Sequence, residues 1–359
     1  MLICGYKNID NIDKERRMAK LKDVAKLANV SVSTVSRILN NDTSLSVTDK
    51  TKNEVLNAAR QLNYPIKQKE KRTTFAIIQW FSQDQEISDP YYLTLRRGAE
   101  SFLKKNNIAV RRFFHDDLDM DSTLSQIDGI LCLGKFSKKY IDKLKKYTQR
   151  IILLDMTLYP CREVSIVLDF DDAVKQVIQY LYIYGHRKIG YLGGIEFVDQ
   201  NQEIYEDPRK ESFIKYCKKF NIQYENYILE DKFSSESGYK MMTDMIYSQN
   251  LPTAIFAASD PIAIGALRAL QDNGYKVPDD ISIIGFDNIE TVNFTNPPLT
   301  TVHSPSFDMG VLGAKILYYN ISNQSESMSI RIQMPCFLIE RNSVKNAWGK
   351  RSRLCNGLP

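Results

Sequence analysis

Residues 21–41 read LKDVAKLANVSVSTVSRILNN, and the apolar positions predict two short helices joined by a tight turn. The first helix would bury a row of side chains at helical spacing, namely Leu21, Val24, Ala25 and Ala28. Asn29 tolerates a left-handed backbone conformation, so we expect the helix to end there. Ser31 then stands where its hydroxyl can cap a second helix. This stretch predicts a helix-turn-helix unit.

The second predicted helix has an apolar inner face and a polar outer face. The inner face holds Val35, Ile38 and Leu39, and the outer face holds Val32, Ser33, Ser36, Arg37 and Asn40. Thr48 can cap a third helix whose inner face would hold Val55, Ala58, Ala59 and Leu62. A short polar face with one arginine suits the major groove of DNA. A generic three-helix bundle fits the same spacing, so spacing alone leaves both interpretations open.

Composition and charge limit the class of protein. The chain has 359 residues, of which 43% are hydrophobic, so it can form two or three domains with cores of their own. Residues 18–74 contain eleven Lys or Arg against five Asp or Glu, whereas the whole chain has a net charge of only +5. The positive charge is therefore concentrated in the N-terminal segment, as expected where a protein meets phosphates.

The cysteines and the apolar runs indicate a cellular compartment. The six cysteines are scattered, with no CxxC pair and no neighbouring histidine, so we expect reduced thiols and no metal site. No apolar run approaches the roughly 18 residues that span a bilayer. Residues 1–17 lack the apolar segment of a signal peptide. We therefore expect a cytoplasmic protein with no membrane partner.

From residue 75 onward, short apolar runs alternate with helical patterns, which predicts an α/β domain with a mainly parallel sheet. The predicted strands are 75–80, 109–114, 129–133, 151–154, 165–168, 188–192, 254–257, 281–284 and 330–338. The predicted helices include 92–105, 171–184, 209–220, 235–247 and 261–273. About 270 residues of this pattern exceed a typical single domain, so we expect two lobes.

The sequence matches the known motifs of enzymes poorly. Residues 129–135, GILCLGK, approach the spacing of a phosphate-binding loop, but Phe136 stands where Ser or Thr would hold the metal. Residues 190–194 lack the GxGxxG spacing of a dinucleotide site. The three histidines lie far apart, and no serine occupies a nucleophile elbow. We therefore predict no catalytic residues, no cofactor and no metal.

The N-terminal segment closely resembles the DNA-binding head of the LacI–GalR repressor family, through residues 21–41 and through 47–64, VTDKTKNEVLNAARQLNY. The resemblance implies base contacts by Val32, Ser33 and Arg37. It places Leu21, Thr34, Ser36 and Asn40 near the DNA backbone or in support of the helix. Arg37 can make a bidentate bond to guanine, so it is expected to be the main specificity residue.

The segment after the third helix departs from the family pattern. Members carry a short hinge helix with a leucine that wedges into the minor groove, whereas residues 65–74 read PIKQKEKRTT. This looks more like a basic linker, although Ile66 can substitute for the leucine. We expect phosphate contacts from it, and the predicted DNA-contacting set includes Tyr64, Lys67, Lys69, Lys71 and Arg72.

The body also resembles this family, whose effector domain is similar to periplasmic sugar-binding proteins. The segments that carry the resemblance are 185–194, 254–270, 276–290 and 296–302. The implied domains are a head at 18–64, the linker 65–74 and an effector domain at 75–342. Three crossings between lobes imply an N-lobe of 75–169 with 304–329, and a C-lobe of 170–303 with 330–342. A ligand would lie in the cleft at the carboxyl ends of the strands.

The resemblance also implies a set of effector-binding residues. Arg209 in DPRKESF and Asp287 in GFDN match the family's ligand-binding arginine and aspartate. Taken without the family, Arg209 reads as a surface salt bridge and Asp287 as a loop residue that bonds its own backbone. The remaining candidates are Asp89 and Tyr91 after the first strand, Ser259 where many members have Asn, and Asp260 beside it.

The family resemblance implies a homodimer that binds a pseudo-palindromic operator and responds to a small sugar. The loop 79–90 and the segment 205–209 most resemble the branch that regulates galactose and β-galactoside operons. A different sugar or a co-repressor is an alternative effector. The sequence does not determine whether the effector weakens or strengthens operator binding. Two other classes, a sugar-transport protein and an α/β enzyme with an added head, are rivals. We expect residues 1–17 and 343–359 to be disordered.

Overall fold

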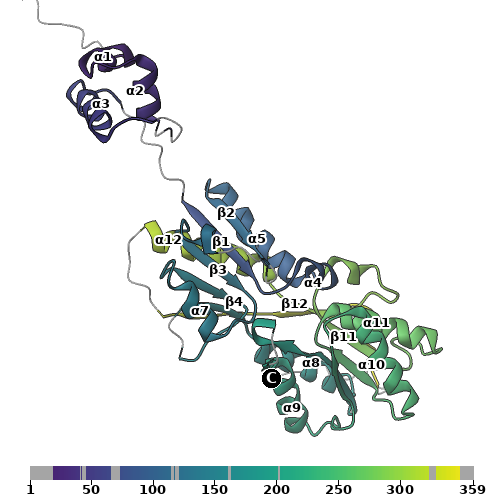
Figure 1. Ribbon diagram of the computed structural model, residues 1–359. Helices are drawn as coiled ribbons and strands as arrows, with labels where there is room; N and C mark the ends of the chain where they lie inside the picture. The colour runs from purple at the N-terminus through teal and green to yellow at the C-terminus, as the bar shows by residue number, and fades with distance from the viewer. Residues whose placement is uncertain are drawn as a thin grey trace, which may run out of the picture. The chain divides into compact units, whose positions relative to one another are not determined.

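The computed structural model describes residues 19–40, 42, 46–65, 73–114, 117, 121–160, 163–200, 203–322 and 329–347. It divides the chain into two units, Met1–Arg72 and Thr73–Pro359, which we call the head and the body. Figure 1 labels the elements of both units. The basic linker at 66–72 lies outside the described residues, so the expected contacts of Lys67, Lys69, Lys71 and Arg72 remain predictions.

The head consists of three helices, α1 (Leu21–Leu27), α2 (Val32–Leu39) and α3 (Asp49–Gln61). Ser31 caps α2 by accepting a 3.0 Å hydrogen bond from the N–H of Thr34, and Thr48 caps α3 in the same way. Asn29 adopts a left-handed conformation at φ 52°, which turns the chain between α1 and α2. One core joins the helices, with Val24, Val35 and Val55 fully buried. The three predicted helices and both caps are confirmed.

The first sheet of the body is wholly parallel and forms the N-lobe. Its strands lie in the order β13-β5-β4-β3-β1-β2. Their bounds are β1 (Thr74–Gln79), β2 (Ala109–Phe113), β3 (Gly129–Leu133), β4 (Ile151–Leu154), β5 (Val164–Leu168) and β13 (Arg331–Met334). The lobe's helices are α4 (Gln83–Ser88), α5 (Tyr91–Lys105), α6 (Asp121–Leu124), α7 (Lys138–Leu144) and α12 (Ser306–Ser322).

Helices α5 and α12 cross very closely in this lobe. A Cβ atom on Gly98 of α5 would lie 2.0 Å from the carbonyl oxygen of Phe307, and one on Gly310 of α12 would lie 1.9 Å from that of Leu95. Only glycine permits this approach of the two backbones. The two helices therefore form one layer against the sheet, visible in Figure 1.

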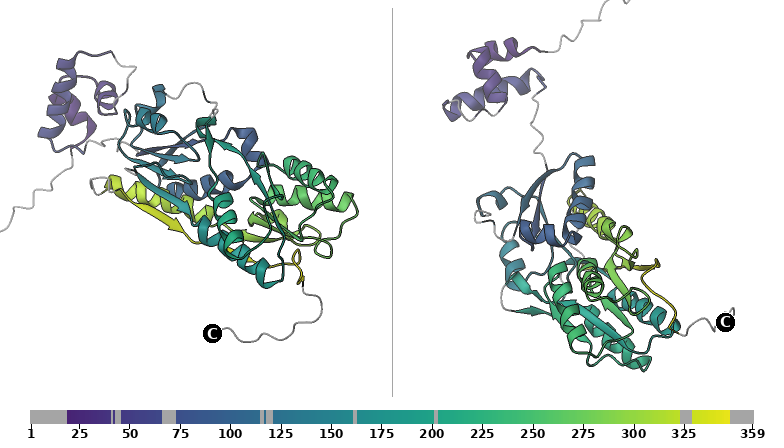
Figure 2. Two further views of the ribbon diagram at one scale, coloured as in Figure 1. Left: turned by 90° about the horizontal axis from the view of Figure 1, so that it is seen from below. Right: turned by 90° about the vertical axis from the view of Figure 1, so that its right-hand side faces the viewer.

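The second sheet forms the C-lobe, in the order β14-β12-β11-β10-β6-β9, and only β14 runs antiparallel. Its strands are β6 (Ile189–Gly194), β9 (Ile228–Asp231), β10 (Ala254–Ala257), β11 (Ser282–Asp287), β12 (Thr300–His303) and β14 (Phe337–Ile339). Its helices are α8 (Phe170–Ile183), α9 (Pro208–Lys219), α10 (Ser235–Tyr247), α11 (Asp260–Asp272) and the short η2 (Glu290–Asn293). A small hairpin of β7 (Glu196–Phe197) and β8 (Ile204–Tyr205), with η1 (Val198–Gln200) between them, lies apart from both sheets. Figure 2 shows helices around both sheets, which confirms the predicted α/β class.

One predicted strand and one lobe boundary are wrong. The sequence pattern predicts a single C-lobe strand at residues 330–338, but β13 pairs with β5 in the N-lobe and β14 pairs with β12 in the C-lobe. Pro335 lies between them and has no N–H to donate to a sheet. The N-lobe sheet therefore extends to Met334. The sequence prediction also missed β9 and β12, which are four residues each and partly polar.

The expected C-terminal disorder is contradicted for residues 343–347. Ser343 is fully buried, and its hydroxyl accepts a 2.8 Å hydrogen bond from the N–H of Thr300 and donates one of 2.6 Å to Ile283. His186 bonds the carbonyl oxygen of Lys345 at 3.1 Å. Residues 1–17 and 348–359 lie outside the described residues. Among the residues that are described, no helix is long and apolar enough to cross a membrane.

Candidate functional site

The outer face of α2 carries the predicted base-contacting side chains. Val32 is 40% exposed, and Ser33, Arg37 and Asn40 are also exposed. Arg37 lies 3.7 Å from the carboxylate of Asp42 in an exposed ion pair, which contributes little to stability and leaves the guanidinium available. The short polar surface can therefore enter a groove, with Arg37 its only cation.

The other predicted DNA-contacting residues of the head support this face. Leu21, Thr34, Ser36 and Tyr64 are half-buried, and Leu21 and Tyr64 pack against the head core. The hydroxyl groups of Ser31 and Thr34 lie 2.7 Å apart at the start of α2. The packing of Leu21 and Tyr64 on the shared core helps to hold the three helices together, and the Ser31–Thr34 contact stabilises the first turn of α2.

In the body, side chains from both lobes meet in a small chamber at the carboxyl ends of the strands, as expected for an open α/β sheet. We call it the inner chamber. Its lining consists of Asp89, Tyr91, Tyr92, Asp155, Leu168, Phe170, Glu196, Arg209, Phe233 and Asp287. Four predicted effector residues, Asp89, Tyr91, Arg209 and Asp287, are thus brought together. Its volume is about 20 Å³, room for roughly one water molecule.

Arg209 is held rigidly in the first turn of α9. Its Nε donates to both carboxylate oxygens of Asp207, at 2.9 and 3.0 Å, and its Nη1 donates to the carbonyl oxygen of Ala258 at 2.6 Å. The guanidinium lies within 5.5 Å of the centres of three aromatic rings, those of Phe170, Phe233 and Phe286. Burial lowers the pKa of Arg209, but Asp207 outweighs that effect and raises it well above the usual value. Arg209 is therefore a fixed cation in the chamber wall.

Asp155 links the tyrosines of the N-lobe to a buried lysine. Its carboxylate accepts hydrogen bonds from the hydroxyl groups of Tyr92 at 2.7 Å and Tyr91 at 3.2 Å, and from Nζ of Lys135 at 2.6 Å. Lys135 and Asp155 are only 4% and 5% exposed. Lys135 ends the stretch 129–135, whose spacing approaches that of a phosphate loop, and it pairs with a carboxylate rather than with a phosphate. Sequence analysis missed Tyr92, Lys135, Asp155 and Glu196, although the last three each follow a buried strand.

Three carboxyl groups of the chamber have raised pKa values. Burial raises the pKa of Asp89 to about 6, although the N–H of Tyr91 and the charge of Arg209 oppose the shift. Burial also raises the pKa of Glu196 to about 7, against the opposing charge of Lys135. Burial and the neighbouring Asp89 raise the pKa of Asp287 well above its usual value. Near neutral pH these groups can therefore donate as well as accept hydrogen bonds.

The other two predicted effector residues lie outside the lining of the inner chamber. Ser259 caps α11 by accepting a hydrogen bond from Ile262, and its side chain is buried. Asp260 is fully buried, and its carboxylate accepts from Thr301 Oγ1 at 2.6 Å and from the N–H of Ile289 at 2.9 Å. Both residues hold the start of α11 and the end of β11 in place. The expectation that they contact the ligand directly is not supported by this placement.

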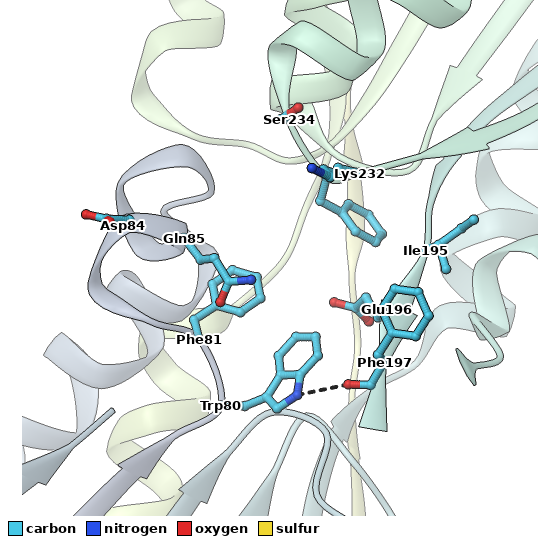
Figure 3. Close-up of a pocket in the computed structure, with 10 residues that line it drawn as sticks. Trp80, Phe81, Asp84, Gln85, Ile195, Glu196, Phe197, Lys232 and Ser234 are labelled. Carbon is cyan, nitrogen blue, oxygen red and sulfur yellow. Dashed lines mark hydrogen bonds between the residues drawn. The ribbon is translucent and has the colours of Figure 1, made fainter. Parts of the chain in front are cut away.

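A second and larger chamber adjoins the first. We call it the outer chamber, and it is lined by Trp80, Phe81, Asp84, Gln85, Ile195, Glu196, Phe197, Lys232, Phe233 and Ser234. Its volume is about 440 Å³. Figure 3 shows Trp80 and Phe81 of the N-lobe facing Glu196 and Phe197 of the C-lobe across it. The indole Nε1 of Trp80 donates a 3.0 Å hydrogen bond to the carbonyl oxygen of Phe197.

Comparison with known proteins identifies the family. Residues 20–65 match the model of bacterial regulatory proteins of the lacI family, and residues 178–344 match that of a periplasmic binding protein-like domain. The transcriptional regulator GalR of Streptococcus thermophilus is 39% identical over 307 residues, which cover 84% of this chain and 92% of that protein. The chain belongs to the LacI family.

Further relatives and solved structures agree with this membership. The repressor MelR of Bacillus subtilis is 31% identical, over 91% of this chain and 97% of that one. A lac repressor dimer bound to operator superposes with a TM-score of 0.68 at 22% identity, over 92% of this chain and all of the other, which supports the fold. The predicted resemblance is confirmed. As a LacI-family member, the chain is a helix-turn-helix transcriptional repressor with a sugar-binding effector domain, and its relatives are regulators rather than enzymes.

Proposed function

We propose that galactose or a β-galactoside controls the affinity of this repressor for its operator. The observation that supports the proposal is the meeting of Asp89, Arg209 and Asp287 in one chamber between the lobes. A carboxyl group and a guanidinium group can each bond two neighbouring hydroxyls of a sugar. Two solved structures with the same fold are complexes with cellobiose and with lactose.

The charges of the inner chamber favour a neutral sugar over a phosphorylated one. Among the described residues, four carboxyl groups line it, Arg209 is the only cation of the lining, and Arg209 is already paired with Asp207. Lys135 behind it is paired with Asp155. A phosphate group would meet this carboxyl-rich wall and would lose favourable hydration without gaining a free cation. Neutral hydroxyl groups avoid that cost.

On the DNA side, we propose that Arg37 reads a guanine in each half-site of a pseudo-palindromic operator. Val32 and Ser33 lie on the same exposed face of α2 and would contact neighbouring bases. A further set of residues would contact the DNA backbone or support the recognition helix. This set consists of Leu21, Thr34, Ser36, Asn40, Tyr64, Lys67 and Lys69. A cytoplasmic homodimer formed through the body would present two heads to the two half-sites.

Movement of the lobes is the proposed link between sugar and DNA. Because the inner chamber has a volume of only about 20 Å³, a sugar ring that reaches Asp89 and Asp287 has to change the closure of the lobes. The same change would alter the spacing of the two heads in a dimer. A co-repressor would act through the same movement, but it would strengthen operator binding, whereas an inducer would weaken it.

A gel-shift titration with the DNA upstream of the protein's own gene tests the proposal. We expect binding that galactose or lactose changes at least several-fold, and that galactose 1-phosphate leaves unchanged. Strengthened binding would identify a co-repressor, and weakened binding an inducer. Binding that responds to neither sugar would overturn the proposed effector and leave the repressor assignment intact.

A further inference from the structure

The outer chamber is much larger than the inner one and is different in its chemistry. We propose that it is a subsite for a second sugar ring, so that the effector is a β-galactoside of at least two rings rather than free galactose. The proposal rests on the proposed function and names the class of sugar that the same cleft takes.

The volumes of the two chambers support a ligand with more than one ring. The outer chamber, at about 440 Å³, lies within the range of roughly 300–1,000 Å³ typical of small-molecule sites. The inner chamber, at about 20 Å³, holds roughly one water molecule. A single ring that opened the inner chamber without reaching the outer one would leave the larger space, with its apolar walls, in contact with water. A second ring would remove that surface from water.

The walls of the outer chamber suit a pyranose ring. Phe197 and Ile195 are each 38% exposed and line the C-lobe side of the space, and Trp80 and Phe81 line the N-lobe side. Exposed apolar side chains gathered at a cavity commonly mark a binding site. The C–H face of a sugar ring is apolar and packs on the faces of aromatic rings, whereas its hydroxyl groups point outward around the edge.

Polar side chains lie at the edge of the outer chamber, around its apolar walls. Asp84 and Gln85 of α4 lie on the N-lobe side, and Lys232 and Ser234 lie on the C-lobe side, as Figure 3 shows. They include a carboxylate, an amide, an ammonium and a hydroxyl group, so both donors and acceptors are present without a dominant charge. Such a mixed rim matches the neutral hydroxyl groups of a sugar better than it matches a charged ligand.

The two chambers are neighbours, because two side chains form part of the wall of each. Glu196 and Phe233 line both of them. One ligand can therefore place its galactosyl hydroxyls against the polar inner wall, with Glu196 beside the glycosidic link and the second ring among the aromatic side chains. The carboxyl group of Glu196, whose pKa burial raises to about 7, can donate or accept at that position.

Calorimetric titration of the full-length protein with galactose and with lactose tests this subsite. We expect lactose to bind about tenfold more tightly than galactose, because the second ring adds aromatic contacts. Phe197→Ala should reduce that preference to about threefold or less. Phe294 is 80% exposed and lines neither chamber, so Phe294→Ala is the matched control and should keep the wild-type preference.

The outcomes separate this inference from the proposal on which it rests. Equal affinity for galactose and lactose would overturn the second subsite and leave a galactose sensor. Binding of neither sugar would overturn the proposed effector itself. A Phe197→Ala protein that loses affinity for both sugars equally would show that Phe197 acts through lobe closure rather than through the second ring. If Phe197→Ala does not fold, Ile195→Ala provides the same comparison, with the same loss of preference expected.

Discussion

The backbone N–H of Ser137 in the N-lobe donates a 2.7 Å hydrogen bond to the carboxylate of Asp199 in the C-lobe. The N–H of Asp199 in turn donates to the carbonyl oxygen of Lys135 at 2.9 Å. With the bond between Trp80 and Phe197, these contacts tie the hairpin of β7 and β8 to the N-lobe beside both chambers. The hairpin therefore holds the two lobes in the arrangement seen here.

Removal of the Asp199 carboxylate should loosen this closure. Asp199 has a left-handed backbone, with φ 50°, which glycine adopts without strain. We expect Asp199→Gly to lower the free energy of unfolding by about 1–2 kcal/mol, because a charged hydrogen bond is lost. Asp199→Asn keeps an acceptor oxygen and should lose less than half as much. Urea denaturation monitored by tryptophan fluorescence provides the comparison, and equal losses in the two variants would argue against the bond.

Arg37 should determine operator specificity. We expect Arg37→Ala to weaken operator binding by about 1–3 kcal/mol and to relax discrimination at one base pair of each half-site. Arg37→Lys keeps the positive charge but loses the planar guanidinium that can make two parallel hydrogen bonds. We therefore expect it to keep more of the affinity for DNA in general than of the discrimination between bases. Fluorescence anisotropy with wild-type and single-base operator variants measures both effects. Lys219→Ala, an exposed cation of the body, is the control, and the same loss there would contradict a base-reading role for Arg37.

The buried pair of Lys135 and Asp155 should matter far more to stability than an exposed pair. Lys135→Met leaves a charged carboxylate buried without its cation, so we expect a loss of about 3–5 kcal/mol in the free energy of unfolding. Lys175 pairs with Asp172 at the surface, with side chains 44% and 52% exposed. Lys175→Met should therefore cost no more than about 0.5 kcal/mol. Similar denaturation midpoints for the two variants would show that the buried lysine is dispensable.

The stability of the body should fall as pH rises through neutrality. Burial raises the pKa of Asp89 to about 6 and that of Glu196 to about 7, above the values of about 4 in an unfolded chain. Their contribution is therefore fully present below pH 4 and is lost as pH rises through 6 to 7.

Between pH 5 and pH 8 we expect these groups to lower the free energy of unfolding by about 1–3 kcal/mol. The double variant Asp89→Asn, Glu196→Gln should reduce this dependence without abolishing it, because burial also raises the pKa values of Asp260 and Asp287. Glu211→Gln, which removes an exposed carboxyl group on α9, should keep the full dependence. Urea denaturation at a series of pH values measures the slope. An unchanged slope in the double variant would rule these two groups out as its cause.

The head and most of the α/β pattern could be predicted from sequence because their signals are local. Ser31 and Thr48 cap the helices that follow them, and Asn29 takes the left-handed turn, through contacts within a few residues. The boundary at Pro335 could not be predicted in the same way. Both β13 and β14 are extended segments, and only their pairing partners decide which lobe each one joins.

Local sequence patterns were enough to predict the three-helix head and the exposed face around Arg37, and family motifs were enough to name Arg209 and Asp287 as candidates. Which side chains meet between the lobes depends on the packing of the whole body. The tertiary structure places Asp260 in the core, bonded to Thr301, and it brings Asp155 and Glu196 to the chambers, with Lys135 paired to Asp155 behind them. The physical reason is that a cleft is assembled from the ends of strands far apart in the chain, so its geometry depends on how two sheets pack rather than on any local pattern.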